Sequence, residues 1–426
     1  MSQLKKHLKN FLKNHDFLRN LAWKTHAELK RMKYQKMAAG ESIDHKLVIF
    51  ETFMGRQYGC NPKAMYEYML TDSRFNDYRF VWVLNDENKA DDLPGRDRVE
   101  IVEANSDRHY KLLAQAGYVV TNSKLDFGVK KKDGQVFLQT WHGTPLKKLR
   151  CDIVAEKGNA MNSLKEIREK NDADIVRFDY FISPSKFCSD KFTSAFNLKK
   201  LGLENILVET GYPRNDLLFN YDEEYAQGIR EKLNIKEGKK VILYAPTFRD
   251  NQHDGAGYTY DLHMDFDALR ESLQEEYVIL FRAHYFVASQ FDFAKYEGFI
   301  YDVSQLDDIT PLYTIADILV TDYSSVFFDY ANLKRPMVFY MYDLEEYADN
   351  IRGFYMDIDE LPGLIVKDEV SLIEEIKRIN DGGFTYDKKY EAFNNKYNYL
   401  DDGNASKRAV EILFKMKEEK SCETSL

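Results

Sequence analysis

Four segments of the chain end an apolar run with side chains that suit phosphate chemistry. In the most informative one, the apolar run that follows Asp317 leads into Thr321-Asp-Tyr-Ser-Ser325, which opens a helix. A helix start offers backbone N–H groups without internal partners, and Ser324 and Ser325 add hydroxyl donors. The pattern predicts a phosphate site. The plainer interpretation is that the serines only cap the helix.

In the other three segments, an apolar run likewise ends in cationic or imidazole side chains. They are Thr140-Trp-His-Gly-Thr-Pro-Leu-Lys-Lys148, Tyr244-Ala-Pro-Thr-Phe-Arg249 and Arg282-Ala-His284. Open α/β sheets bind ligands at the carboxyl ends of their strands. We therefore expect the Arg, His, Lys and Ser side chains of all four segments to gather along such an edge.

Taken in order, these segments resemble the CDP-glycerol glycerophosphotransferase family of teichoic acid synthesis. The matching segments are 140–147, Gly211-Tyr-Pro-Arg-Asn-Asp216, 244–249, 282–284 and 321–325, and 51–68 resembles that family's amino-terminal signature. The resemblance extends from about Leu47 to about Tyr399. It implies transfer of glycerol phosphate or ribitol phosphate from a CDP-alditol to a hydroxyl of a lipid-linked teichoic acid or capsule-type acceptor, with release of CMP.

Such a transfer needs a base for the attacking hydroxyl and groups that stabilise charge on the pyrophosphate. His142 is the predicted base, because the pKa of imidazole lies close to working pH and Gly143 leaves room for close approach. The alternative is a core histidine bonded to backbone. His284 is predicted to serve the donor, as a proton or hydrogen-bond donor to the leaving CMP oxygen.

The remaining donor contacts are expected in the carboxyl-terminal half and the interdomain turn. The predicted donor-binding residues are Arg249, Arg282, Thr321, Asp322, Ser324, Ser325 and Arg214. Arg282 and His284 share a face only if the strand continues through both. Asp322 would repel a diphosphate, so it either orients an arginine or a ribose hydroxyl, or simply builds the turn.

An anionic acceptor, such as a polyol-phosphate chain or a phosphorylated lipid, predicts a basic lining near the base. The predicted acceptor-binding residues are Gly143, Thr144, Lys147, Asn61 and Lys63. For the lysines, the alternative is surface solvation.

Neither a metal nor a cofactor is predicted. The Asp-x-Asp pairs at 172–174 and 357–359 lie outside the motif set, so neutralisation by Arg, His and a helix start is the simpler account. The four cysteines form no CxxC pair. This indicates neither a zinc site nor a disulfide framework and favours a reducing, cytoplasmic location.

Residues 1–40 differ electrostatically from the rest of the chain. They hold ten Lys and Arg against two acidic residues, a net charge of +8, which leaves −18 for residues 41–426. Apolar residues recur among the lysines at roughly helical spacing, namely Leu4, Leu8, Phe11, Leu12, Leu18, Leu21 and Trp23. The pattern favours an amphipathic helix on an anionic membrane surface, and hence a peripheral enzyme at the cytoplasmic face of the membrane.

Two alternatives remain for this segment: a solvated helix packed on the body, or a nucleic-acid arm. The acidic body argues against nucleic acid as a partner. There is no run of about 18 apolar residues and no signal peptide with a cleavage site, so we expect neither a membrane span nor secretion.

Past Gly40 the alternation of strands and helices predicts parallel sheets. Expected strands include 47–53, 80–84, 118–121, 134–140, 179–184, 206–209, 277–281, 318–321, 336–340 and one that begins at Val241. We expect an α/β GT-B fold of two doubly wound Rossmann-like domains across a cleft. Residues 41–210 would bind the acceptor and 211–426 the CDP-alditol, with the helix at 404–420 crossing back by analogy.

Two further functions share this fold. One is a GT-B glycosyltransferase that uses a nucleotide sugar, and the other is a catalytically silent membrane-bound scaffold. Two candidate catalytic histidines weigh against the scaffold, and the Trp-His-Gly-Thr-Pro and Thr-Asp-Tyr-Ser-Ser pairing weighs against the sugar transferase. The choice of glycerol or ribitol, of primase or polymerase, and of oligomeric state stays open.

Overall fold

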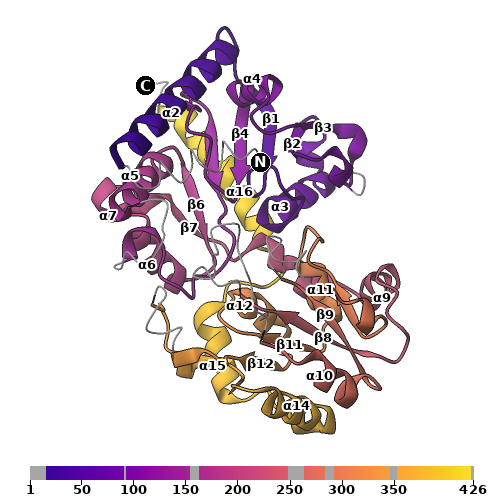
Figure 1. Cartoon of the computed structure of the whole chain (residues 1–426). Helices are drawn as coiled ribbons and strands as arrows, with labels where there is room; N and C mark the ends of the chain where they lie inside the picture. The colour runs from indigo at the N-terminus through magenta and orange to yellow at the C-terminus, as the bar shows by residue number, and fades with distance from the viewer. Residues whose placement is uncertain are drawn as a thin grey trace.

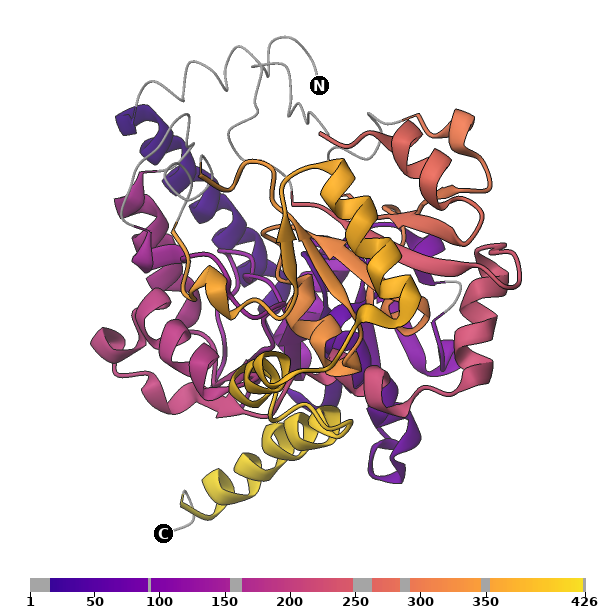
Figure 2. The same ribbon diagram turned by 90° about the horizontal axis from the view of Figure 1, so that it is seen from below.

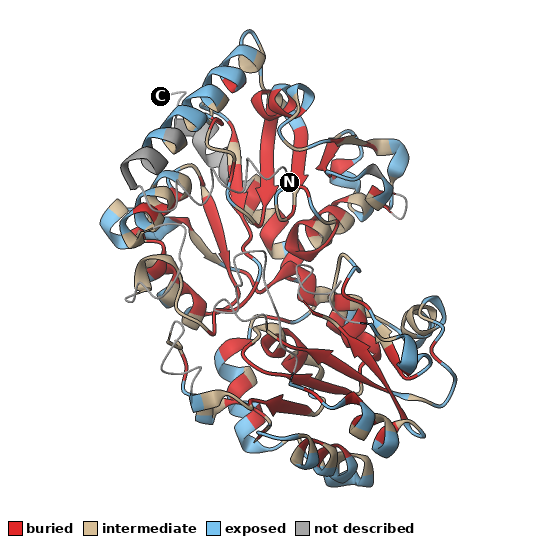
Figure 3. Ribbon diagram, in the orientation of Figure 1, coloured by how far each residue is buried: buried red, intermediate tan, exposed pale blue. Residues whose placement is uncertain are grey.

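The chain folds into two parallel β-sheets, each with helices on both faces (Figure 1). The structure is a computed structural model that describes residues 16–90, 93–153, 163–247, 263–283, 292–345 and 353–423. The strands of both sheets are the most consistently buried parts of the molecule (Figure 3). The α/β class with two doubly wound domains, predicted from the sequence, is confirmed.

The first sheet has seven strands in the order β3-β2-β1-β4-β5-β6-β7, all parallel. Their bounds are β1 (Asp44–Glu51), β2 (Arg79–Val83), β3 (Val99–Val102), β4 (Ala116–Thr121), β5 (Val136–Gln139), β6 (Tyr180–Ser183) and β7 (Leu207–Glu209). The order reverses between β1 and β4. Doubly wound folds bind ligands at such a switch point, outside the carboxyl ends of the strands.

Helices cover both faces of this sheet, because the inner strands are apolar on both sides. Their bounds are α2 (Asp16–Ala38), α3 (Cys60–Thr71), α4 (Asp107–Gln115), α5 (Leu164–Ile175), α6 (Lys186–Ala195) and α7 (Leu198–Leu201). Along β1, Leu47 and Ile49 face the core that includes Tyr34 of α2, whereas Val48 and Phe50 face the opposite core.

The second sheet repeats the topology with six parallel strands in the order β10-β9-β8-β11-β12-β13. The strands are β8 (Lys240–Ala245), β9 (Tyr277–Phe281), β10 (Ile300–Asp302), β11 (Ile318–Thr321), β12 (Met337–Tyr340) and β13 (Leu364–Val366). Its helices are α8 (Leu217–Asn220), α9 (Glu223–Lys232), α10 (Phe266–Leu273), α11 (Thr310–Ile315), α12 (Val326–Tyr330), α14 (Glu369–Arg378) and α15 (Lys388–Tyr397). Its switch point lies between β8 and β11.

The last helix, α16 (Ala405–Glu423), returns to the first domain. Its Phe414 ring lies 4.3 Å from the Tyr118 ring and 4.9 Å from the Phe75 ring, centroid to centroid. Leu413 is buried in the same core. Since α2 packs into the core on the other face, the two helices cover opposite faces of the first sheet, as the view from below shows (Figure 2).

Candidate active site between the two domains

The loop after β5 carries the predicted base. Trp141 adopts a left-handed backbone conformation, with φ +53°, and turns the chain so that His142 reaches solvent while Gly143 and Thr144 are buried. A left-handed conformation is strained for a bulky side chain. Strong local contacts must therefore hold this loop in place.

The His142 ring is oriented by three neighbours. Its Nδ1 lies 2.9 Å from the carbonyl oxygen of Asn122, the residue that follows β4. A carbonyl can only accept, so Nδ1 carries the proton and Nε2 presents a lone pair. The Trp141 ring stacks on the imidazole at 4.2 Å between centroids, and the Phe53 ring meets it edge-on at 5.6 Å.

The surroundings of His142 keep the ring neutral. The residue is partly exposed, while the Trp141 and Phe53 rings and the Asn122 carbonyl pack against the imidazole. This desolvation lowers the pKa of His142 to about 4; the nearby Arg214 and Arg150 lower it further, and the Asn122 hydrogen bond opposes them. At neutral pH the imidazole is in the form that a general base requires.

The segment Thr321-Asp-Tyr-Ser-Ser325, called the donor motif below, forms a turn at the switch point of the second sheet. Thr321 is fully buried and donates its hydroxyl to Ala245 O at 2.7 Å. The buried Asp322 carboxylate accepts from the backbone N–H of Thr247 at 2.8 Å and of Tyr323 at 2.6 Å. These contacts join the ends of β8 and β11, so for Asp322 the geometry favours turn-building over a donor contact.

The paired serines end this turn at the face that meets the first domain. Ser325 is the residue before α12, yet its side chain makes no capping hydrogen bond. α12 has only five residues, so a helix dipole contributes little and the hydroxyl and N–H groups are the relevant donors. A methyl group built on Gly143 would lie 3.0 Å from Ser325 Oγ. The two motifs, 182 residues apart, are therefore in contact.

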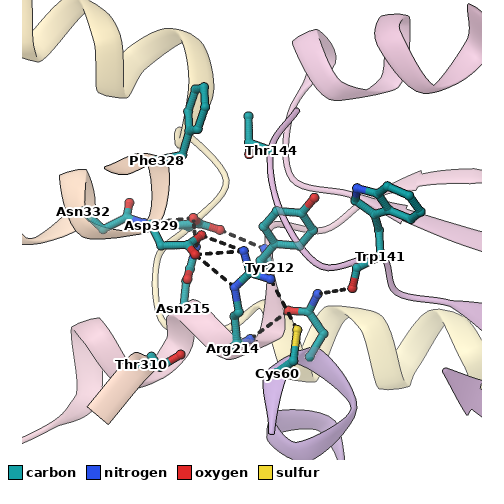
Figure 4. Close-up of polar contacts among 12 residues, drawn as sticks. Cys60, Trp141, Thr144, Tyr212, Arg214, Asn215, Thr310, Phe328, Asp329 and Asn332 are labelled. Carbon is teal, nitrogen blue, oxygen red and sulfur yellow. Dashed lines mark hydrogen bonds and ion pairs between the residues drawn. The ribbon is translucent and has the colours of Figure 1, made fainter. Parts of the chain in front are cut away.

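Arg214 lies in the interface between the two domains, where it forms an ion pair with Asp329 (Figure 4). Its Nη2 donates to Asp329 Oδ2 at 2.8 Å and to Oδ1 at 2.9 Å, and both side chains are 7% exposed. Its Nη1 lies 3.4 Å from Cys60 Sγ. The guanidinium is thus committed to Asp329, and a donor contact by Arg214 stays a prediction.

A second polar layer surrounds this pair. Asn215 Nδ2 donates to Asp329 Oδ1 at 3.2 Å and to Asp401 Oδ2 at 2.7 Å. Asn332 Nδ2 also donates to Asp401, at 3.0 Å. Burial raises the pKa of Asp401 to about 7.

At the other end of the interface, two aspartates of the second domain hold the first. Asp308 Oδ2 lies 3.0 Å from Lys63 Nζ, and Asp307 pairs with Lys89 and accepts from the Tyr58 N–H. Lys63 therefore has an interdomain partner, which differs from the acceptor contact expected for it.

Arg282 organises the loop that carries these aspartates. Its Nη1 and Nη2 donate to Val303 O and Leu306 O, both at 2.8 Å. β9 ends at Phe281, so Arg282 stands beyond the strand. Its donor contact stays a prediction.

The acceptor-side residues differ in their surroundings. Thr144 is buried, with Cys188 Sγ 3.7 Å from its Oγ1. Lys147 is half-buried and forms an antiparallel bridge with Phe354 of the second domain. Asn61 is fully buried, and its amide binds backbone atoms of the loop before His142. Lys147 alone of the three reaches the surface.

Two predicted residues, Arg249 and His284, lie outside the described residues. Within those residues, no group of three or more His, Cys, Asp or Glu is placed to hold a metal ion. In the same part of the chain, no helix is long and apolar enough to span a membrane.

Several residues that shape the site have no predicted role in the sequence. Asn122 follows the end of β4, so it carries the same signal as the motifs, a polar residue after a buried strand. Phe53 lies within the matching segment 51–68, in the turn after β1. Asp329 and Asp401 carry no such signal. Their partners lie 115 and 186 residues away in the chain.

Comparison with known proteins identifies the family. Residues 33–415 match the model of CDP-glycerol:poly(glycerophosphate) glycerophosphotransferase. A teichoic acid poly(glycerol phosphate) polymerase of Bacillus subtilis (strain 168) is 42% identical over 383 residues, which cover 89% of this chain and 50% of that protein. A polymerase of the same name from Bacillus spizizenii is 40% identical over 376 residues, which cover 87% and 92%.

Among solved structures, the wall teichoic acid polymerase TagF superimposes with a TM-score of 0.82 at 34% identity, covering 99% of each chain. The chain spans about half the length of the Bacillus subtilis relative and of a Staphylococcus epidermidis polymerase. Family model, relatives and fold agree, and the chain belongs to the CDP-glycerol:poly(glycerophosphate) glycerophosphotransferase family.

Proposed function

We propose that this chain transfers glycerol phosphate from CDP-glycerol to a hydroxyl of a teichoic acid acceptor. The observation that carries the proposal is the position of His142. Its Nε2 lone pair is free of the Asn122 hydrogen bond, its pKa is low, and the next residue touches Ser325 of the donor motif.

In the proposed reaction, the acceptor hydroxyl oxygen attacks the phosphorus that bears glycerol. The bond from that phosphorus to the bridging oxygen breaks, and CMP leaves with this oxygen. The hydroxyl proton passes to His142 Nε2. Ser324 and Ser325 offer hydroxyl and N–H donors to the donor phosphates. His284 and Arg249 are proposed to bind the leaving CMP and the diphosphate.

The relatives favour glycerol over ribitol in the donor. The poly(glycerol phosphate) polymerases named above are 40–42% identical to this chain over nearly nine-tenths of it. The teichoic acid ribitol-phosphate polymerase TarK of Staphylococcus aureus is 30% identical over a similar share. A glycerol-phosphate primase of Bacillus subtilis is 31% identical over 71% of the chain. A teichoic acid glycerol-phosphate transferase of Staphylococcus aureus is 39% identical over 87% of the chain. We propose repeated addition of glycerol phosphate, and the length of the product distinguishes it from a single addition.

The described part of α2 supports a membrane surface as a further partner. Tyr34 and Trp23 on one side contact the body, whereas Leu21, Leu29 and Met32 on the other side are each more than half exposed. An apolar side flanked by basic residues suits the headgroup region of an anionic leaflet. We therefore propose peripheral binding at the cytoplasmic face of the membrane.

The test is a transfer assay with CDP-glycerol and CDP-ribitol, separately, on a lipid-linked acceptor, following CMP release and product mass. We expect CMP release and a ladder of glycerol-phosphate additions with CDP-glycerol. His142→Ala should reduce turnover by about 10²–10⁴-fold while CDP-glycerol still binds. We also expect transfer to continue in EDTA. Wild-type turnover of His142→Ala would end the assignment of the base.

A further inference from the structure

We propose that Asn61 is a positioning residue for His142 and that it connects the base to the donor domain. This inference rests on the proposed function, since it assumes that His142 is the base. The side chain of Asn61 comes from the start of α3 and is fully buried between the motif loops. It therefore acts through other residues rather than on substrate.

The first contacts of Asn61 fix the loop of the base. Its Nδ2 donates to Thr140 O at 3.0 Å and to Trp141 O at 3.1 Å. Two successive carbonyl groups usually point in different directions, and here the left-handed Trp141 brings both to one amide. Because His142 follows directly, the Asn61 amide sets where the imidazole stands.

The remaining contact of Asn61 leads to the donor domain. Its Oδ1 accepts from the Arg214 backbone N–H at 3.1 Å. The Arg214 guanidinium in turn binds both oxygens of Asp329, on the same short helix α12 that Ser325 begins. Figure 4 shows Arg214 between Asp329 and Cys60, with Trp141 beyond. Asp329 on α12 is thus connected to the base loop through Arg214, whose side chain and backbone each form one link, and through Asn61.

The chain contains a matched control for this amide. Gln135 is also buried, its Nε2 donates to Leu113 O and Ala116 O, both at 2.7 Å, and its Oε1 accepts from the Lys132 N–H at 2.9 Å. The pattern of bonds is the same and the domain is the same. Gln135 precedes β5, however, at the end of the sheet away from His142.

The experiment compares two nearly isosteric substitutions, Asn61→Leu and Gln135→Met, in the transfer assay. Each removes one donor pair and one acceptor, so we expect comparable losses of thermal stability. A misplacement of about 1 Å at a catalytic group costs roughly 10²-fold in rate. We expect Asn61→Leu to lower kcat by about that factor with the KM for CDP-glycerol changed less than threefold, and Gln135→Met to keep kcat. Asn61→Asp, which keeps size and acceptor, serves if Asn61→Leu does not fold.

The decisive measurement is a double-mutant cycle with His142→Ala. If Asn61 acts through His142, adding Asn61→Leu to His142→Ala lowers the residual rate by less than about threefold. An undiminished loss in that background, or wild-type kcat in Asn61→Leu itself, overturns the inference and leaves the proposed function intact. Wild-type turnover in His142→Ala alone instead overturns the base assignment, and this inference with it.

Discussion

At the scale of single residues, the low pKa of His142 determines how catalysis responds to pH. An ordinary histidine loses its free-base form as the pH falls through about 6.5. Desolvation of the ring by the surrounding protein lowers the pKa of His142 to about 4, so the base stays unprotonated down to about pH 5. We expect kcat to be flat from pH 8 to pH 5 and to decline only near pH 4.

The contribution of His142 to the free energy of unfolding also falls as the pH decreases. A histidine whose folded pKa is lowered stabilises the fold fully above its unfolded pKa, and this contribution is lost as the pH falls toward the folded pKa. Circular dichroism at each pH separates unfolding from loss of the base. A decline of kcat centred near pH 6.5 in the folded enzyme would show that the imidazole is not held neutral.

Gly143 provides a second prediction at this scale. A methyl group at this position would lie 3.0 Å from Ser325 Oγ and 3.9 Å from Arg214 Nη2. We expect Gly143→Ala to push the two motif loops apart and to raise the KM for CDP-glycerol while lowering kcat. Gly228 in α9 has open space around it, so Gly228→Ala is the control and is neutral or stabilising by up to about 1 kcal/mol. Unchanged kinetics in Gly143→Ala would contradict a closed contact between the loops.

The sequence indicated which residues gather at the interface better than it indicated what each one contacts. Motifs after strand ends located His142 and Ser325, because the carboxyl end of a parallel strand is a topological position. For Asn61 and Arg214 the motifs predict substrate contacts, whereas the structure gives both of them protein partners. Their partners lie 79 to 153 residues away, and no local pattern in a sequence reports such distances.

At the scale of elements, α16 provides a prediction about stability. Leu413 is buried against the first sheet although it lies near the end of the chain. We expect Leu413→Ala to destabilise the first domain by about 2–5 kcal/mol. Hydrogen exchange should rise in β1, β2 and β4 and stay unchanged in β8–β13. Val370→Ala on α14, where the side chain is 66% exposed, is the control. Faster exchange in the second sheet alone would contradict this placement.

Interior strands were predicted and three edge strands were not. β4 is buried at every position and reads as an apolar run. β3, β10 and β13 lie at sheet edges, have three or four residues and are partly exposed. These three short strands have no distinctive pattern of their own, because their pairing comes from the adjacent strand; β7, also at an edge, was expected from residues 206–209.

At the scale of the whole molecule, the two-sided α2 makes the membrane proposal testable without truncation. Tyr34 is part of the first core, so deletion of residues 1–40 would also damage the fold. We expect Leu29→Ser with Met32→Ser to weaken binding to vesicles of phosphatidylglycerol and phosphatidylcholine and to slow transfer to a lipid-linked acceptor. Transfer by this variant to a soluble short-chain acceptor should proceed at the wild-type rate.

The salt dependence of vesicle binding is an independent test of the same surface of α2, and we expect binding to weaken as salt is added. Each basic residue near an anionic leaflet contributes about 1 kcal/mol, and added salt screens this attraction. Val370→Ser, on the other domain, is the control for an exposed apolar residue. Equal vesicle binding by the wild type and the Leu29/Met32 variant would return α2 to a helix that only packs on the body.

Within the described residues, the chain passes between its two halves at two places, near Gly211 and near Leu400, and these two places lie side by side. A methyl group on Gly211 would be 2.7 Å from Leu400 O, and the Tyr212 N–H donates to Asp401 at 2.9 Å. The second half is therefore inserted into the first through two adjacent backbone connections. These connections allow the second half to rotate about them as a hinge, whereas a sliding or twisting motion would stretch both backbones at once. Residues 212–400 thus form a cassette with neighbouring ends, which could be exchanged between relatives as one piece without moving the base from its own half.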